Sequence, residues 1–460
     1  MSKLVDMPFW KLVYTNDLDA FVPEVWAQES LMILEANMVA ANLVHRDFED
    51  EIAQFGDTVN TRRPATFEGK RKVDGDDVTV QDASATNVPV VLNQHLHTSF
   101  MIHDGEESKG FKNLVVEYLT PALMSIAQMI DEIIMGQVYE FLAYHVGQLG
   151  TDITKATVVA AKEMFNRNKA PMTGRNFVIS PNAEGDLLNI GEFTKANEVG
   201  DAGSALREGH VGRKFGFDFF MCQNTPSVAA GSTIVEGAVH NVGGYAAGTT
   251  TMTVDGLSAA LTNGCWFTVE GDMIPQRLVS SVGGATPSSM TFSPGLSYAV
   301  ANDAVITIYT PGAVNYASNY AAGYGKALTV NGFTVAPKIG QLVSFAAGTN
   351  VYSALSTPTT TSVLLNRPLD VAAAHTAAVG VGPAGDYNFA FHKNALALVT
   401  RPLAAPMNGT GALSTVANYN GLSVRVTITY NGTRQGHLVT VDLLCGTKTL
   451  DTRLGCVVLA

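Results

Sequence analysis

The 460-residue sequence has few cysteines, few charges and no long uncharged apolar run. Its four cysteines, Cys222, Cys265, Cys445 and Cys456, lie far apart and form no C-x-x-C pair, so the sequence predicts neither a zinc site nor a dense disulfide framework. A membrane span needs about 18 consecutive apolar residues, and none is present. The apolar stretch in MSKLVDMPFWKLV is too interrupted for a signal peptide. We therefore expect a chain made in a reducing cytosol, with no membrane partner.

Basic residues are also scarce. The chain has 29 Lys and Arg against 41 Asp and Glu, a formal net charge of -12. Affinity for phosphates comes mainly from clustered Lys and Arg, so this balance argues against a free-standing nucleic-acid binder. Hydrophobic residues make up 46% of the chain and charged residues only 15%, and the mean hydropathy is +0.14. The length of 460 residues predicts two or three domains, and the composition predicts much surface for partners to cover.

The common catalytic signatures are missing. There is no G-x-S-x-G elbow and no H-E-x-x-H pair, and Gly325-Lys326 is followed by Ala327, so it is not a nucleotide-binding lysine motif. Residues 380–385 satisfy G-x-G-x-x-G, but dinucleotide binding also needs a preceding strand, a following helix and an acidic residue about 20 positions on. We interpret this segment as a loop at a domain junction. No cofactor and no enzymatic activity are predicted.

One histidine group leaves a metal site open as an alternative. His95, His97 and His103 fall on the odd positions of a segment whose even positions are mostly apolar, the period of a half-covered strand. Asp104, Glu106 and Glu107 follow directly. A solvated strand face beside a helix start explains all of these residues, and we favour it over a metal cluster.

Periodicity predicts an α+β fold. Residues 23–44 and 114–146 carry apolar side chains at helical spacing, and Pro121 marks either the start of the second helix or a kink in it. A third helix is expected from Thr154, with Pro171 just past its end. Residues 176–180 (NFVIS) predict a buried strand, followed by a short helical piece around Leu187.

Residues 231–380 differ from the rest of the chain in composition. They contain only six acidic and four basic residues, and they are rich in Gly, Ala, Thr, Ser and Val. Short apolar runs separated by Gly or Pro predict a separate β-rich domain, a small barrel or sandwich. Mixed character returns after Tyr387 and ends in two alternating strands, LSVRVTITY and HLVTVDLL. The β-rich segment therefore looks inserted between two halves of another domain.

A second feature is a loop with charges of both signs inside an extended, strand-like region over residues 56–102. A basic cluster is followed at once by acidic residues, and the clearest turn signal is Asp74-Gly75. Opposite charges on one protruding loop suit pairing between identical subunits, since each copy can offer a base to its neighbour's acid. A solvated hairpin is the alternative. The candidate inter-subunit residues are Arg62, Arg63, Lys70, Arg71, Lys72, Asp74, Asp76 and Asp77.

In this order, the segments resemble the major capsid proteins of tailed bacteriophages, in particular the subgroup with an inserted β-barrel domain. The resemblance spans nearly the whole chain. The stretches that carry it are FVPEVWAQESLMILEANMVAANLVHRDFE (21–49), FGDTVNTRRP (55–64), LREGHVGRKFGFDFFMCQNTP (206–226), YNFAFHKNALALVTRPLA (387–404) and SVRVTITYNGTRQGHLVTVDLLCG (423–446).

The resemblance implies a domain order. Residues 1–49 would form an N-terminal arm and helix, and residues 50–107 an extended loop that reaches over a neighbouring subunit. Residues 108–229 and 386–460 would build the peripheral and axial domains, with a long spine helix in the first part. Residues 230–385 would be the inserted all-β domain.

The resemblance also implies a function. The chain would assemble with itself, as pentamers and hexamers, into an icosahedral shell that encloses double-stranded DNA. It would use a scaffolding protein and a portal, touch the packaged DNA weakly and without specificity, and reach the virion capsid after assembly in the host bacterial cytoplasm. The alternatives are a tail or decoration protein, a metal-dependent enzyme using the three histidines, and a cellular nanocompartment that shares the shell fold but lacks the insertion.

Overall fold

The computed structural model describes residues 38–46, 58–63, 69–75, 77–78, 80–81, 86–104, 118–194, 211–232, 234–257, 261–282, 289–345, 350–355, 358–401, 403–407, 412–419 and 422–460. The chain divides into two compact units. One comprises residues 1–36, 95–126 and 400–444, and the other comprises residues 37–94, 127–399 and 445–460. Within the described ranges, no helix combines the length and apolarity needed to cross a membrane.

The smaller unit is built on antiparallel strands. In its sheet β25 (Leu422–Asn431) lies between β24 (Leu413–Tyr419) and β26 (Gly436–Thr449), and β3 (Gln94–His103) pairs with β26. The alternation predicted for β3 is confirmed, because Leu96 and Ile102 are buried whereas His95, His97 and His103 are exposed. Arg425 and Asp442 are direct cross-strand partners, and the guanidinium donates two hydrogen bonds to the buried carboxylate.

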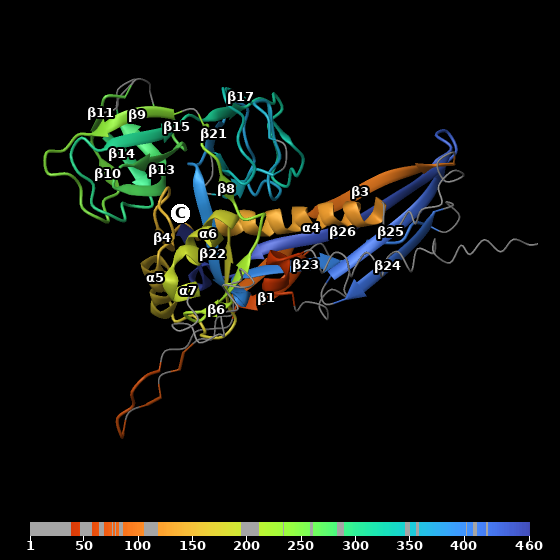
Figure 1. Cartoon of the computed structure of the whole chain (residues 1–460), viewed down its shortest axis with the longest axis horizontal. Helices are drawn as coiled ribbons and strands as arrows, with labels where there is room; N and C mark the ends of the chain where they lie inside the picture. Colours follow the sequence, from red (N-terminus) through yellow and green to blue (C-terminus); the bar gives the residue numbers. More distant parts are fainter. Residues whose placement is uncertain are drawn as a thin grey trace, which may run out of the picture. The chain divides into compact units, whose positions relative to one another are not determined.

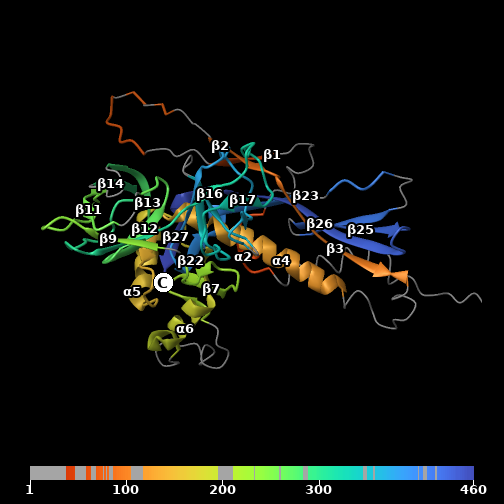
Figure 2. The same ribbon diagram turned by 90° about the horizontal axis from the view of Figure 1, so that it is seen from above.

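A mixed sheet forms the centre of the larger unit. Its strand order is β4 (His145–Gly147), β27 (Gly455–Leu459), β22 (Gly385–His392), β5 (Arg175–Ile179), β7 (Phe217–Met221) and β6 (Arg213–Lys214). The helices α5 (Lys155–Arg167) and α6 (Pro181–Asn189) lie beside this sheet (Figure 2) and share one apolar cluster with it. Phe165, Phe177 and Val458 are among its buried members.

Local signals place both helices where the sequence predicts them. Thr154 caps α5, since its hydroxyl accepts a hydrogen bond from the Thr157 amide while the Thr157 hydroxyl accepts one from the Thr154 amide. Ser180 caps α6 by accepting from the Ala183 amide, and Pro181 follows at the first helical position. The short helix α7 (Gly191–Thr194) follows α6. The predicted strand over 176–180 is confirmed as β5.

The long helix predicted over residues 114–146 has two parts in the described residues and ends at Phe141. α4 runs over Thr120–Met135, and Pro121 lies in its first turn. The chain then tightens into the 3-10 helix η4 (Gly136–Phe141). Residues 114–117 lie outside the described ranges. The change of helix type coincides with Gly136, where an added Cβ would come within 2.7 Å of the Ser353 Cβ.

Two sheets form the charge-poor segment, for which the sequence predicts a β-rich domain, a small barrel or sandwich. The first has the order β10 (Thr251–Met252), β14 (Ser289–Ser293), β13 (Asp272–Val282), β12 (Trp266–Val269), β15 (Val305–Tyr309), β9 (Ile234–Val239) and β11 (Val254–Asp255). The second has the order β19 (Val351–Ser353), β18 (Leu342–Phe345), β21 (Ala378–Val381), β16 (Gly312–Val314), β17 (Leu328–Asn331) and β20 (Ser362–Val363). Each sheet has an apolar core of its own, and Figure 1 draws the first in green and the second in teal.

The remaining elements are short. β1 (Thr58–Arg63) and β2 (Thr86–Val91) form an antiparallel hairpin, and β8 (Ser227–Val228) pairs with the start of β22. The others are β23 (Leu396–Arg401), η5 (Lys393–Ala395) and η6 (Thr452–Leu454). Of the helix predicted over 23–44 only its end is described, as α2 (Ala40–Leu43), and residues 23–37 lie outside the described ranges. The buried Asp131 carboxylate on α4 accepts hydrogen bonds from the backbone amides of Val39 and Ala41 at 2.8 and 3.0 Å. These bonds fix the start of α2 to α4.

Candidate functional site

The predicted inter-subunit residues lie on β1 and on the loop that joins it to β2. Arg62 and Arg63 pair with Asn87 and Thr86 of β2 through the backbone, and their side chains lie outside what the structure describes. Asp76 is outside it as well. The others are all exposed: Lys70, Arg71, Lys72, Asp74 and Asp77. The structure thus places the described charges on one exposed loop and does not pair them with one another.

The same loop exposes apolar side chains. Val73 is 65% exposed, Val78 74% and Val80 87%. Gly75, at the turn, has a φ of +101°, and a Cβ added to it would have no atom within 4 Å. The turn is therefore surrounded by solvent on this side. Three exposed valines beside unpaired charges leave this loop with unburied apolar surface, which an intermolecular contact would cover.

The three candidate histidines do not converge on a metal position. His95 lies 3.5 Å from the buried Asp442 carboxylate, and its ring meets that of His97 with the centroids 6.2 Å apart. The His103 ring instead lies 3.2 Å from the carbonyl oxygen of Arg434. Within the described part of the chain, no three His, Cys, Asp or Glu side chains gather where they could hold a metal ion. Glu106 and Glu107 lie outside that part.

The glycine-rich segment 380–385 lies between two strands. Gly380 is in β21, Gly385 begins β22, and no helix follows. A dinucleotide site needs a helix N-terminus at this point, so the junction-loop interpretation agrees with the geometry.

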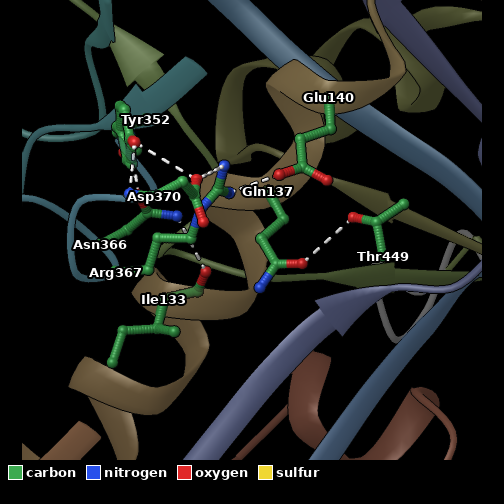
Figure 3. A network of polar contacts seen from close by, with 9 residues as sticks. Ile133, Gln137, Glu140, Tyr352, Asn366, Arg367, Asp370 and Thr449 are labelled. Carbon is green, nitrogen blue, oxygen red and sulfur yellow. Dashed lines mark hydrogen bonds and ion pairs between the residues drawn. The ribbon is translucent and has the colours of Figure 1, made fainter. Parts of the chain in front are cut away.

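A polar network joins the second β-sheet to η4 in the larger unit (Figure 3). The Arg367 guanidinium lies 2.5 Å from the Glu140 carboxylate of η4 and 3.1 Å from Asp370, and it stacks over the Tyr352 ring at 4.8 Å. The Tyr352 hydroxyl donates to Asp370 at 3.2 Å and accepts from the Asp370 amide at 3.0 Å. Burial lowers the pKa of Arg367, but the two carboxylates outweigh it and hold that pKa above its ordinary value.

Hydrogen bonds between side chains and the backbone accompany this network. The Asn366 side-chain amide donates to the Ile133 carbonyl at 3.4 Å and its oxygen accepts from the Ser353 amide at 3.1 Å. The Tyr139 hydroxyl donates to the Gly340 carbonyl at 2.5 Å. These bonds hold the end of α4 and η4 against the sheet, and Gly136 leaves no room there for a Cβ, which would lie 2.7 Å from the Ser353 Cβ.

Sequence reasoning missed this network. The available signal was the presence of Arg367 and Asp370, three residues apart, in a segment that has only ten charges. A charged side chain in an apolar, charge-poor domain is expected to have a partner of opposite charge, because burial of an unpaired charge costs free energy. The sequence gives no indication that the partner is Glu140.

Comparison with known proteins gives one family match. A family model described as phage capsid protein matches residues 119–260, which run from the start of α4 into the first β-sheet. No curated protein matches the chain.

Solved structures of phage proteins resemble the chain at low sequence identity. A structure from Mycobacterium phage Che8 is 13% identical, covers 92% of this chain and 90% of its own, and gives a TM-score of 0.43. The capsid of Cyanophage P-SCSP1u is 11% identical, with coverage of 88% and 84% and a TM-score of 0.39. The capsid of Ralstonia phage GP4 is 9% identical, with coverage of 91% and 87% and a TM-score of 0.39.

The family match and the residues described above have a common interpretation. Residues 119–260 carry the pattern of a phage capsid protein, and the histidine and glycine motifs do not form a catalytic or cofactor site in the described ranges. The expectation of a structural, non-enzymatic role is confirmed by the family. The match over residues 119–260 supports a phage capsid role for this chain, as a structural protein of the virion shell.

Proposed function

We propose that copies of this chain form pentamers and hexamers that close into an icosahedral shell around double-stranded DNA. The observation that carries the proposal is the capsid family match over residues 119–260. A closed shell needs each subunit to contact several others, and many moderate contacts together give a stable assembly. We infer that a scaffolding protein and a portal take part, and that assembly takes place in the host cytoplasm.

The loop between β1 and β2 is proposed to contact a neighbouring copy. Lys70, Arg71, Lys72, Asp74 and Asp77 are exposed, and none of them has an ion-pair partner among the described residues. An exposed loop with charges of both signs can pair with an identical subunit, base to acid. Arg62, Arg63 and Asp76 belong to the same proposed contact.

Residues 230–385 are proposed to be an insertion into the domain formed by residues 108–229 and 386–460. β8 ends at Val228 and pairs with Gly385 at the start of β22, so the chain leaves and re-enters at neighbouring positions. Neighbouring ends are what insertion of one domain into another requires. The two sheets between these ends have their own cores, which supports the proposal. Residues 1–49 and 50–107 are proposed as the arm and the extended loop.

Electron microscopy of negatively stained particles tests the shell. The chain is expressed alone and together with its neighbouring viral genes, and the products are compared on a sizing column and on grids. We expect closed shells of regular diameter in at least the second sample. A chain that stays monomeric, or forms only small oligomers in both samples, contradicts the proposal, and open tubes would point to a tail protein.

The role of DNA is tested on the same shells. Particles produced with the complete set of viral genes are treated with nuclease and then opened. Recovery of long, protected double-stranded DNA is expected. Shells that hold none under these conditions would contradict the enclosure of a genome while leaving self-assembly intact.

A further inference from the structure

The larger unit has a groove of about 700 Å³ that none of the contacts described above occupies. Its walls come from η4, from β12 and β13 of the first β-sheet, and from β19 and the segment around residue 370 of the second sheet. Lys448 at the end of β26 closes one side. A volume of this size is within the range of roughly 300–1,000 Å³ that holds a small ligand or a short turn of peptide.

The groove has unbalanced positive charge. Its two carboxylates, Glu140 and Asp370, are both engaged by Arg367. Arg277 has no carboxylate partner in the described part of the chain; it donates to the Phe345 carbonyl at 2.6 Å, and its Nε is buried without an acceptor. Lys448 is exposed and likewise has no ion pair with a described residue. The three cations of the lining exceed its two carboxylates by one, and neither Arg277 nor Lys448 has a carboxylate partner among the described residues, which favours an anionic occupant.

The rim of the groove is also apolar. Val279 is 54% exposed and Val371 48%, although both line the groove. Exposed valines beside uncompensated cations suit a ligand that combines carboxylates with apolar side chains. A free phosphate or a nucleotide would satisfy the cations but would leave the valines exposed.

This chain offers such a ligand in the turn of the β1–β2 loop. Residues 73–78 read VDGDDV, so valines lie on both sides of three aspartates. Val73, Asp74, Asp77 and Val78 are exposed, so the turn does not fill the groove of its own chain. Asp74 and Asp77 thus have no ion pair with a described residue on the loop, and Arg277 and Lys448 have none in the groove.

We propose that the groove lined by Arg277 and Lys448 is the docking site for the acidic turn, residues 73–78, of a second copy of this chain. The proposal rests on the proposed function and names the receiving surface for the extended loop. Asp74 and Asp77 pair with the two cations, while Val73 and Val78 cover Val279 and Val371. Repetition of this contact from copy to copy around a ring would join the extended loop of each subunit to the next.

Chemical cross-linking of shells tests the docking directly. The four native cysteines are buried, and burial raises the pKa of Cys222 and Cys265 to about 12, so engineered exposed cysteines react first. A chain with Val73→Cys and Val371→Cys is assembled and treated with a short bismaleimide. We expect covalent dimers and higher oligomers on a denaturing gel. The matched control pairs Val73→Cys with Val242→Cys, which is 97% exposed and does not line the groove, and it should stay monomeric.

Charge reversal gives a second, independent readout. Lys448→Glu is expected to raise the subunit concentration needed for assembly by about three- to tenfold. Adding Asp74→Lys or Asp77→Lys, one at a time, is expected to restore it for the aspartate that faces position 448, because the other aspartate still pairs with Arg277. Lys326→Glu, at an exposed lysine outside the groove, is the control and should change nothing. Because Lys448 is exposed, the folded subunit should be unaffected, which circular dichroism verifies.

The possible results separate this docking from the proposed function. Wild-type shells that form normally, with no cross-link to Val371→Cys and no effect of Lys448→Glu, would overturn the docking and leave the shell intact. A cross-link that stays within one chain would also overturn it, because no larger species would appear on the gel. Failure of the wild-type chain to form shells would refute the proposed function first.

Discussion

At the scale of single residues, Arg367 is the strongest candidate for a residue that holds the second β-sheet to η4. Its side chain is 11% exposed, and its guanidinium is shared by Glu140 and Asp370. We expect Arg367→Met to lower the free energy of unfolding by about 2–4 kcal/mol, because two partly buried carboxylates lose the one cation that pairs with them among the described residues. Urea unfolding of the unassembled chain measures this. The matched control is Arg167→Met, whose pair with Glu163 on α5 is exposed and should contribute no more than about 0.5 kcal/mol. If the two variants lost equal free energy of unfolding, Arg367 would not be the residue that holds the second β-sheet to η4.

Gly136 makes a second prediction at this scale. A Cβ there would lie 2.7 Å from the Ser353 Cβ and 2.9 Å from the Asn366 side-chain nitrogen. Gly136→Ala should therefore destabilise the chain by about 1–3 kcal/mol through overpacking, in spite of the better helix propensity of alanine. Gly185 in α6 has nothing within 4 Å, so Gly185→Ala should stabilise by about 0.5–1 kcal/mol. Thermal unfolding followed by circular dichroism compares the stability of the two variants. If both variants were less stable than the wild type, steric contact at Gly136 would not explain the destabilisation.

His392 predicts how stability changes with pH. Burial lowers the pKa of this imidazole, and its Nδ1 accepts a hydrogen bond from the Asn394 amide, which requires the neutral ring. The unfolded chain then binds the proton more readily than the folded chain, so stability falls as the pH drops below about 6.5. His392→Asn keeps an acceptor and should show a smaller loss between pH of about 7.5 and 5. His375→Asn, at an exposed histidine, should behave as the wild type does.

At the scale of elements, strong local signals were sufficient for prediction. The Thr154 cap located α5, the apolar run over 176–180 located β5, and alternation located the covered face of β3. The exposed charged loop could also be predicted, because Asp74-Gly75 and its flanking charges are local in sequence. These features share one property: the residues that determine them lie within a few positions of each other.

Elements that depend on distant contacts could not be predicted. Apolar spacing continues through Phe141, so periodicity alone extended the helix past Met135, where contact with Ser353 and Asn366 accompanies the change to η4. The short apolar runs in residues 234–381 predict strands but not which strands pair, so a barrel and a sandwich were both expected and neither strand order could be predicted. The Arg367–Glu140 pair and the groove were missed for the same reason, since their walls come from segments far apart in the chain.

β27 provides a test at this scale. Its five residues are buried between β22 and β4, and Val458 belongs to the cluster shared with α5 and α6. Deleting residues 455–460 should remove more than the roughly 5–15 kcal/mol that separates folded from unfolded chains, and the product should not fold cooperatively. Replacing residues 70–78 by a Gly-Ser linker of equal length should leave the thermal midpoint unchanged, because the described part of this loop is exposed. Calorimetry measures whether each of the two variants unfolds cooperatively and at which temperature. A deletion variant that still folds would contradict the central role of β27.

At the scale of the whole molecule, the balance of charge bears on what the chain can hold. A subunit with a net charge of -12 repels polyanions, although Lys70, Arg71 and Lys72 form a local basic cluster. If that cluster serves contacts between copies, the chain should bind double-stranded DNA no more tightly than a Kd of about 10⁻⁴ M at physiological salt.

Titration of labelled DNA with the unassembled chain, at several salt concentrations, measures this weak binding. Lys70→Glu combined with Lys72→Glu should impair assembly and leave the negligible DNA affinity as it was. Micromolar binding that weakens steeply with salt, and that disappears in the same double variant, would assign the basic cluster to the phosphate backbone instead. In that case the cations of the loop would face the genome, and only its acidic turn would remain available for a neighbouring subunit.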